Sequence, residues 1–337
     1  MLFATTRPTQ QRYTLVDNEF SGQIASTGYC IFRAKIDEVL PKWILYNISS
    51  DKFNNYVEEN QSGAAYPAIS DTKVKAFKIP IPCPNNPEKS LEIQTEIVRI
   101  LDTFTELTTE LTTELSARKK QYNYYRDQLL SFEEGEVEWK AFGEVAKVQR
   151  GASPRPIAKY ITEDENGVPW IKIGDTSSGS KYVNKTAQKI TPEGAKKSRI
   201  LKKGDFILSN SMSFGRPYIL DINGAIHDGW ASISDFSENL NSDYLYHYLS
   251  SNNVQNYWVS KINSGSVSNL NADLIKALLI PIPPLIEQAR IVTILDKFDA
   301  LTHSISEGLP REIELRQKQY EYYRDLLLSF PKPEVAA

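Results

Sequence analysis

Cysteine and histidine are scarce in this sequence. Its 337 residues include only two cysteines, Cys30 and Cys83, and three histidines, His227, His247 and His303. Two cysteines cannot form the disulfide framework of a small secreted domain. Three histidines far apart in the sequence do not predict a His/Cys metal centre. We therefore expect no metal site and no oxidising compartment.

Long apolar runs are also absent. No stretch reaches the ~18 consecutive apolar residues of a membrane-spanning helix, and Met1 is not followed by a basic and then apolar signal sequence. Hydrophobic residues make up 41% and charged residues 24%, an ordinary globular composition. We expect a soluble, cytoplasmic chain without membrane contact, long enough for two or three domains.

Common enzyme motifs are missing as well. G-x-x-x-x-G-K-[ST], G-x-G-x-x-G, G-x-S-x-G and H-E-x-x-H do not occur. The Asn-Asn-Pro sequence at 85–87 lies in a proline-rich loop, and the acidic run at 163–165 lies in a polar turn, so neither needs a catalytic role. We predict no catalytic residue in this chain.

Charge is distributed unevenly, although the net charge is only −3. Residues 139–234 contain 15 Lys and Arg against 9 Asp and Glu, whereas residues 91–138 contain 5 against 11. This asymmetry favours a polyanion-binding domain joined to a segment with another task, although solvated faces are often equally lopsided.

The sequence contains a tandem duplication. QYNYYRDQLLSF at 121–132 returns as QYEYYRDLLLSF at 319–330, and IVRILDTF at 97–104 returns as IVTILDKF at 291–298. The shorter block IPIP at 79–82 returns at 280–283. Three blocks in the same order, about 200 residues apart, define two copies of one unit.

Each copy ends in a predicted long helix. Apolar residues recur at spacings of three and four from Ile93 to Leu129 and from Ile291 to Leu327, which gives each helix one apolar stripe. The first helix contains no Pro or Gly, whereas Gly308 and Pro310 are expected to break or kink the second. We expect the two stripes to pack on each other in antiparallel orientation.

The first helix contains a four-residue repeat of Thr-Glu-Leu at 105–116. Leu107, Leu111 and Leu115 stay near one face, because four residues leave a rotation of only ~40° and a rise of ~6 Å. Copies could therefore be gained or lost in whole steps, which would change the spacing of whatever the helix separates. Replication slippage without consequence is the alternative interpretation.

The segment from Trp139 to Pro283 is predicted to be a mixed α/β domain. Strands are expected at 142–151, 168–174 and 204–209, and helices at 244–258 and 271–279. The first copy is only about 82 residues long and has no match to 139–206, so its domain is expected to be incomplete or to be completed by strands from elsewhere.

These blocks resemble the specificity subunit of bacterial type I restriction-modification systems. Tandem domains, each followed by Ile-Pro-Ile-Pro and by a long helix that ends Tyr-Tyr-Arg-Asp-x-Leu-Leu-Ser-Phe, carry the resemblance over essentially the whole chain. It implies an α/β (α+β) fold with a truncated target-recognition domain at 1–82, a spacer helix at 83–136, a second target-recognition domain at 137–283 and a second spacer helix at 284–337. The helices are expected to form an antiparallel coiled coil.

The resemblance also implies function and partners. Each target-recognition domain of the family contacts one half of a split site in double-stranded DNA, and the spacer helices bind two methyltransferase (M) subunits. Those partners use S-adenosylmethionine to methylate adenine, and ATP-dependent restriction (R) subunits join the complex, so no cofactor is expected on this chain. The alternative is a partly inactive scaffold or recombination donor that contacts one half-site.

DNA contacts are expected in the turns, where arginine forks and close backbone approach permit base contacts. In the second domain they are Arg150, Gly151, Ser153, Arg155, Lys172, Thr176, Lys181, Tyr182, Ser211 and Arg216, with Lys196 and Lys197 as phosphate contacts. In the first domain they are Thr6, Arg7 and Arg12. A solvated surface charge is the alternative for each, and Trp230 and Tyr29 are expected in the core.

Overall fold

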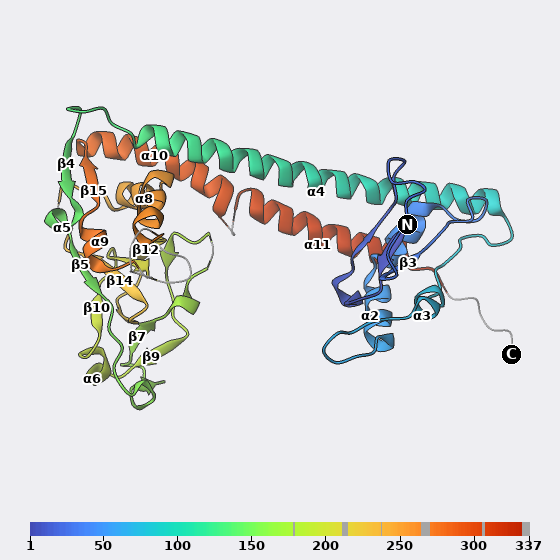
Figure 1. The fold of residues 1–337 in the computed structure, drawn as a ribbon, viewed down its shortest axis with the longest axis horizontal. Helices are drawn as coiled ribbons and strands as arrows, with labels where there is room; N and C mark the ends of the chain where they lie inside the picture. Colours follow the sequence, from blue (N-terminus) through green and yellow to red (C-terminus); the bar gives the residue numbers. More distant parts are fainter. Residues whose placement is uncertain (178, 211–214, 237, 264–269, 305–306, 332–337) are drawn as a thin grey trace. The chain divides into compact units, whose positions relative to one another are not determined.

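The computed structural model describes residues 1–177, 179–210, 215–236, 238–263, 270–304 and 307–331 (Figure 1). The chain forms two compact units. Unit 1 comprises Met1–Thr112 and Glu312–Ala337, and unit 2 comprises Thr113–Arg311. Two helices, α4 (Pro87–Leu129) and α11 (Leu309–Leu327), each contribute residues to both units.

Helix α4 is continuous over 43 residues, as Figure 1 shows. Pro87 occupies its first position, where the missing N–H costs nothing, and no later Pro or Gly interrupts it. Ion pairs one turn apart support the exposed face, with Glu96 to Arg99 at 2.6 Å and Glu114 to Arg118 at 2.7 Å. The predicted uninterrupted first helix is confirmed.

The second helical segment is broken. Helix α10 covers Leu285–His303 and α11 begins at Leu309. Between them Gly308 has a φ of 80°, and a Cβ there would collide with the Ala300 carbonyl oxygen, so only glycine fits this turn. The predicted break at Gly308 is confirmed.

Within each unit the helices pack through aromatic side chains of the repeat. In unit 1, Phe104 of α4 stacks on Tyr323 of α11 with ring centroids 5.7 Å apart. In unit 2, Tyr125 of α4 stacks on Phe298 of α10 at 5.7 Å, and Tyr122 meets the edge of His303 at 5.7 Å. Residue numbers rise on α4 as they fall on the partner, so the predicted antiparallel packing is confirmed.

Besides α4 and α11, unit 1 contains a small sheet, three short α-helices and one short 3-10 helix. Strand β1 lies between β2 and β3, and both pairings are antiparallel. Phe3, Cys30, Phe53 and Val57 form the centre of its core. The elements are β1 (Leu2–Ala4), η1 (Pro8–Gln10), β2 (Tyr13–Thr14), β3 (Tyr29–Ile31), α1 (Pro41–Ile48), α2 (Asp51–Asn60) and α3 (Asp71–Lys75).

The described residues of unit 2 form two five-stranded sheets, ordered β10-β13-β7-β9-β6 and β5-β14-β11-β12-β8, and a two-stranded sheet, β15-β4. Its strands are β4 (Glu138–Ala141), β5 (Lys147–Arg150), β6 (Ile161–Thr162), β7 (Val168–Ile171), β8 (Tyr182–Val183), β9 (Gln188–Ile190), β10 (Arg199–Leu201), β11 (Phe206–Ser209), β12 (Pro217–Leu220), β13 (Gly224–Ile226), β14 (Trp230–Ser234) and β15 (Leu279–Ile282). Its shorter helices are α5 (Phe142–Val145), η2 (Ile157–Lys159), η3 (Ile173–Asp175), α6 (Pro192–Ala195), α7 (Ser242–Leu249), α8 (Asn252–Asn263) and α9 (Ala272–Lys276).

Strand β11 is covered on both faces. Phe206 and Leu208 point into the larger core cluster, which also contains residues of α7 and α10, whereas Ile207 points into a second cluster with Trp230. This alternation follows from the two-residue period of a strand. The sheet that carries β11 therefore lies inside the domain rather than on its surface.

Three local predictions were wrong. The segment predicted as one strand at 142–151 forms α5 and then β5, and the helix predicted at 244–258 is divided into α7 and α8. Tyr29, expected in the core, is 42% exposed, whereas its counterpart Trp230 is fully buried as predicted. The segment at 142–145 is helical because Phe142 and Val145 share one buried face at helical spacing.

A buried glutamine near the start of each long helix holds the globular domain of its unit. In unit 2, Gln288 of α10 accepts a hydrogen bond from the Asn241 backbone N–H at 2.8 Å and donates to the Asn239 carbonyl oxygen at 2.7 Å. The counterpart bonds of unit 1, both 3.0 Å long, join Gln94 of α4 to the Leu40 N–H and the Glu38 carbonyl oxygen. Both side chains are fully buried.

Two turns further along each helix, an aspartate makes a second docking contact. In unit 2, Asp296 Oδ1 lies 2.8 Å from His247 Nε2 and accepts from Lys181 Nζ at 2.9 Å. The counterpart bonds of unit 1, both 2.6 Å long, join Asp102 to the Tyr46 hydroxyl and the Lys42 ammonium group.

The arginine of each Tyr-Tyr-Arg-Asp block is buried and makes the third docking contact. In unit 2, Arg126 lies over the Tyr122 ring at 5.1 Å and reaches the Asn252 side-chain oxygen at 3.4 Å. The counterpart contacts of unit 1 place Arg324 over the Tyr320 ring at 5.7 Å and 2.8 Å from Asp51. Equivalent positions of the two repeats thus hold both domains.

The predicted fold class is confirmed: the chain is a mixed α/β protein with two globular domains and long helices. No helix in the described ranges combines the length and apolarity needed to cross a membrane.

Candidate nucleic-acid interface

Three of the candidate residues gather around one aspartate of unit 2. Ser153 donates from its hydroxyl to Asp228 at 2.8 Å, and Arg155 lies 3.6 Å from the same carboxylate. Arg150, at the end of β5, donates to the Asp228 backbone oxygen at 3.4 Å. The side chain of Arg155 is 85% exposed, so this cluster presents a guanidinium group to solvent while Asp228 orients it.

Gly151 lets two chain segments approach closely beside this cluster. Its N–H donates to the Trp230 carbonyl oxygen at 2.7 Å, and a Cβ at this position would collide with the His227 carbonyl oxygen. Gly151 is buried. Its role in the structure is therefore to bring the turn after β5 against β14, which places Arg155 beside Asp228.

The charge of Asp228 is stabilised by its neighbours. Burial alone would raise the pKa of this carboxyl group, but the Ser153 hydroxyl, His227 and Arg155 outweigh that effect, so the pKa is lowered. Asp228 is therefore ionised at neutral pH and can hold Arg155 in place.

A second group of candidates lies between α6 and β10. Lys196 and Lys197 are exposed, and Lys197 Nζ lies 2.5 Å from the Tyr160 hydroxyl and 4.9 Å above its ring. Arg199 begins β10 and is also exposed. Exposed cations at neighbouring positions suit contacts with phosphate groups, which position a protein on DNA without specifying sequence.

Lys172 and Thr176 flank the short helix η3. Lys172 is half-buried and donates to the Gln188 side chain at 2.8 Å, and Thr176 donates to the Ile173 carbonyl oxygen at 2.8 Å. Both polar groups already have partners within the domain, so they hold the turn after β7 in shape.

The structure places Lys181 in a docking contact rather than on an open surface. Its side chain is 10% exposed and lies 2.7 Å from Asp243 and 2.9 Å from Asp296. Burial alone would lower the pKa of Lys181, but the two carboxylates outweigh it and raise the pKa. The neighbouring candidate Tyr182 is 44% exposed and donates to Asp243 at 3.2 Å. The sequence signal for Lys181 was charge alone, which cannot separate an exposed lysine from a paired one.

Arg216 and Ser211 come from the connection between β11 and β12. Arg216 is half-buried, and its guanidinium group lies 5.5 Å from the centre of the Tyr218 ring. Ser211 lies outside the described residues.

In unit 1 the candidates lie in the connection between β1 and β2. Arg12 donates to the Thr6 carbonyl oxygen at 3.3 Å, and Arg7 lies over the Tyr66 ring at 5.5 Å. Thr6, Arg7 and Arg12 are all exposed. Strand registers make this connection the counterpart of the one between β11 and β12, because Ala4 pairs with Tyr29 as Ser209 pairs with Trp230.

Sequence reasoning did not assign roles to the docking residues or to Asp228. Gln94, Asp102 and Arg126 return in the second copy as Gln288, Asp296 and Arg324, so the same polar residue at equivalent positions of both helices was the available signal. Asp228 carried no such signal. No group of three or more His, Cys, Asp or Glu side chains within the described ranges could hold a metal ion.

The family model of the type I restriction modification DNA specificity domain matches residues 3–119 and 134–315. The chain belongs to this family. The two matched segments correspond to the two copies of the repeat, and each includes a globular domain together with helical residues of the spacer.

Curated members of the family are similar over most of the chain. The EcoR124I/EcoR124II specificity subunit of Escherichia coli is 49% identical over 271 residues, which cover 77% of this chain and 65% of that protein. A putative type I restriction enzyme specificity subunit of Haemophilus influenzae is 41% identical over 271 residues, 77% of this chain and 66% of that protein. The chain thus spans about two thirds of the length of these relatives.

Solved structures share the fold. A chain from a type I R-M system, solved in work on complex assembly and conformational transition, has a TM-score of 0.66 at 23% identity and covers 97% of this chain and 80% of its own. The HsdS subunit from Thermoanaerobacter tengcongensis has a TM-score of 0.53 at 21% identity with the same coverage. The family fold therefore extends over nearly all of this chain.

Proposed function

We propose that this chain is the DNA sequence-recognition subunit of a type I restriction-modification complex. Each globular domain contacts one half of a bipartite site, and the chain positions adenine-N6 methyltransferase and restriction subunits without catalysis of its own. The observation that supports this most is the repeated docking of a domain on an antiparallel helix pair, through Gln94 and Asp102 in unit 1 and Gln288 and Asp296 in unit 2.

In unit 2 the proposed DNA contacts are the exposed cations of two groups. Arg155 and Arg150 at the Asp228 cluster supply guanidinium groups for base edges or phosphates, and Lys196 and Lys197 supply phosphate contacts. In unit 1 the corresponding contacts are Thr6, Arg7 and Arg12.

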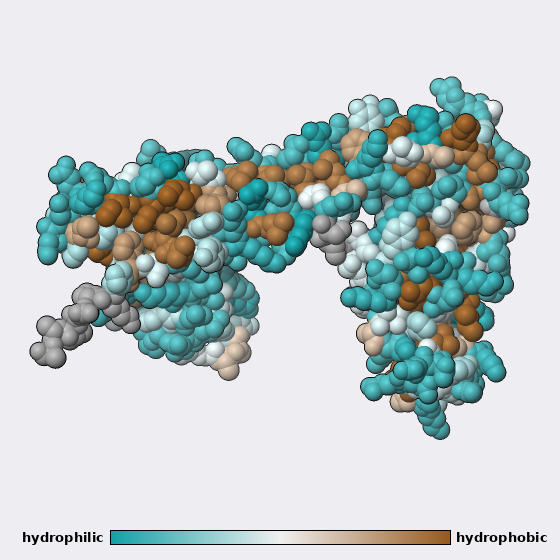
Figure 2. Space-filling view, turned by 180° about the vertical axis from the view of Figure 1, so that it is seen from behind, coloured by the Kyte–Doolittle hydropathy of each residue, from teal (hydrophilic) through white to brown (hydrophobic). Residues whose placement is uncertain are grey.

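The long helices are the proposed binding surface for two methyltransferase subunits. On the face shown in Figure 2, apolar residues gather along the helices of unit 1, whereas the globular part below them is mostly hydrophilic. Exposed apolar patches on a folded chain mark protein interfaces. Exposed apolar side chains on the long helices include Leu315, Tyr322 and Leu326 in unit 1 and Tyr124, Leu285 and Ile286 in unit 2. S-adenosylmethionine and ATP then belong to the partner subunits.

The test is to co-express the full chain with its cognate methyltransferase subunit and to map methylated adenines on genomic DNA by sequencing. The expected result is a split motif, two short sequences separated by a fixed gap, that depends on the presence of this chain. Expression of the methyltransferase subunit alone is the control.

Two outcomes would contradict the proposal. No methylation beyond the control would remove the recognition role and leave a scaffold role. A single half-motif, or one half-motif repeated as an inverted pair, would show that only one of the two domains contacts DNA specifically.

A further inference from the structure

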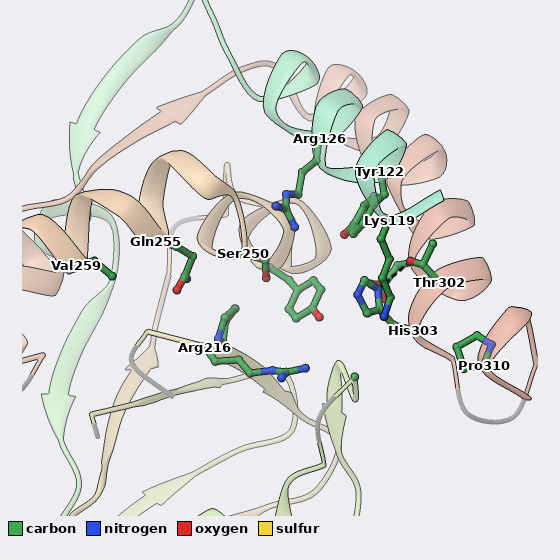
Figure 3. A pocket seen from close by; sticks show the side chains of 14 residues that line it. Lys119, Tyr122, Arg126, Arg216, Ser250, Gln255, Val259, Thr302, His303 and Pro310 are labelled. Atoms are coloured by element: carbon green, nitrogen blue, oxygen red, sulfur yellow. Dashed lines mark hydrogen bonds and ion pairs between the residues drawn. The ribbon is translucent and has the colours of Figure 1, made fainter. Parts of the chain in front are cut away.

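Unit 2 contains a cavity of about 660 Å³ between its globular domain and its long helices. Figure 3 shows the three parts of its wall. Helix α4 contributes Lys119 and Arg126, α10 contributes His303, and the domain contributes Arg216 and Tyr246. Tyr246 lies on α7, one turn from the Ser250 that also lines the cavity.

Positive charge exceeds negative charge on this wall. Lys119, Arg126 and Arg216 are cationic at neutral pH, whereas Asp299 is the carboxylate among the lining residues. Asp299 already has a partner on the same helix, because its Oδ1 lies 3.1 Å from His303 Nδ1. Such a wall favours an anion over a neutral or cationic ligand.

Arg126 has an unused donor at this cavity. The residue is 6% exposed, and its Nε finds no hydrogen-bond acceptor among the described residues, since the carboxylate of Asp127 stands 3.8 Å away. A buried donor without an acceptor is unfavourable. Figure 3 shows the guanidinium group extending from α4 toward the cavity, where an anionic oxygen would supply the missing acceptor.

Lys119 provides a cation on the solvent side of the cavity. It is exposed and has no ion-pair partner in the described part of the chain, and Figure 3 shows its side chain beside His303. The adjacent Lys120 is also exposed but does not line the cavity, because one residue turns a helix by ~100°. The pair offers a matched comparison.

Two tyrosines, Tyr122 and Tyr246, complete the wall as neutral side chains. Burial raises the pKa of Tyr122, and burial likewise raises the pKa of Tyr246, where nearby Asp299 adds to the effect. Both hydroxyl groups therefore remain protonated and add no negative charge to the cavity.

We propose that this cavity binds a phosphate group of the DNA backbone next to the half-site that unit 2 contacts. This inference rests on the proposed function. Arg216 is the last residue of the β11–β12 connection, so the cavity adjoins a candidate DNA-contacting segment, and Lys119 on its lining is exposed to solvent. The spacer helix α4 then contacts DNA directly and fixes the domain's position along it.

The test uses the full chain co-purified with its methyltransferase subunit and measures binding of a fluorescent duplex by anisotropy at 50–200 mM salt. The variants are Lys119→Ala and the control Lys120→Ala. Loss of one phosphate contact should lower the slope of log K against log salt by ~0.9 in Lys119→Ala. Affinity should fall about tenfold, whereas Lys120→Ala should match the wild type.

Equal slopes and affinities for both variants and the wild type would overturn the inference while leaving the proposed function intact. Failure of the wild-type complex to bind any duplex would overturn the proposed function and this inference with it. A free anion is the other source of phosphate. Calorimetry with inorganic phosphate that shows Lys119-dependent binding, while duplex binding is the same for both variants, would assign the cavity to a free anion and overturn the DNA assignment.

Discussion

The two units use the same helix positions to hold different domain side chains. Asp102 in unit 1 accepts from a tyrosine hydroxyl, whereas Asp296 in unit 2 meets the buried imidazole of His247. The second donor also differs, because the side chain of Lys42 is 48% exposed and that of Lys181 only 10%. The aspartate on the long helix is thus the same in both units, whereas its partners in the domain differ in chemistry and burial.

The origin of the lysines explains the difference in burial. Lys42 lies on α1 itself, four residues before Tyr46, so it covers the contact from the outside. Lys181 precedes β8 and reaches Asp296 from a different part of the domain than α7. In unit 2 the contact therefore joins one helix to two segments of the domain. This buries the lysine, whereas the Asp296 side chain is 44% exposed against 25% for Asp102.

Replacing the buried glutamine of either unit should cause the largest loss of stability. Gln288→Ala leaves the Asn241 N–H and the Asn239 carbonyl oxygen without their partner, and Gln94→Ala does the same to Leu40 and Glu38. We expect each to lower local stability by about 2–3 kcal/mol, because a fully buried side chain and its docking hydrogen bonds are lost. Hydrogen exchange should show the loss in α7 for Gln288→Ala and in α1 for Gln94→Ala.

The exposed Gln128 of α4 supplies the control, since Gln128→Ala removes no docking bond and should leave the exchange of α1 and α7 unchanged. Deprotection of both helices by either single substitution would contradict two independent docking contacts.

Substitutions of the two aspartates should differ in how much stability they remove. Asp296→Asn weakens an ion pair with a lysine that is 10% exposed, so we expect a loss of about 2 kcal/mol in unit 2. Asp102→Asn weakens a pair with a half-exposed lysine, so we expect about 1 kcal/mol or less in unit 1. Urea titration followed by hydrogen exchange of α7 and α1 measures both losses, and the reverse order would refute the role given to burial of the lysine.

The smallest expected effect is a dependence of stability on pH, and it should be confined to unit 2. Burial, assisted by the charge of Lys181, lowers the pKa of His247, and the opposing effect of Asp296 does not restore it. Asp299, Tyr122 and Tyr246 also face this histidine or its partners. Protonation is therefore easier in the unfolded chain than in the folded one.

Because the folded pKa lies below the ordinary value of 6.5, this contribution to stability is complete above pH 6.5 and declines as pH falls below it. Exchange of α7 amides, corrected for intrinsic rates, should accelerate from pH 7.5 to 5.5 more than that of α1, where Tyr46 does not titrate. His247→Gln should remove most of the difference. An equal acceleration of α1 and α7 in the wild type would argue against His247 as its source.

The sequence correctly predicted the elements that follow from hydrophobic periodicity. It did not predict element boundaries that depend on tertiary packing. The apolar stripe of α4 and the break at Gly308 follow from local patterns, and both are confirmed. The turn that separates α7 from α8 contains no Pro or Gly, and its local signal is the weaker run of Ser and Asn at 250–253, in which Ser251 accepts from the Val254 N–H.

The candidate site shows the same division. Charge and turn composition found Arg150, Ser153 and Arg155, which the structure gathers around Asp228. The same criteria selected Lys181, whose partners Asp243 and Asp296 lie 62 and 115 residues away in sequence. Long-range ion pairs leave no trace in local sequence, so its burial was not predictable.

The central claim is that one chain carries two DNA-contacting domains on a continuous helix, and deletion of Thr109 to Thr112 tests it most directly. The deletion removes one copy of the Thr-Glu-Leu repeat and shortens α4 by ~6 Å, which keeps the remaining leucines near one face. Sequencing of methylated adenines in cells that co-express the variant with its methyltransferase subunit should show both half-sites unchanged and the gap between them altered. An altered half-site with an unchanged gap would contradict the account.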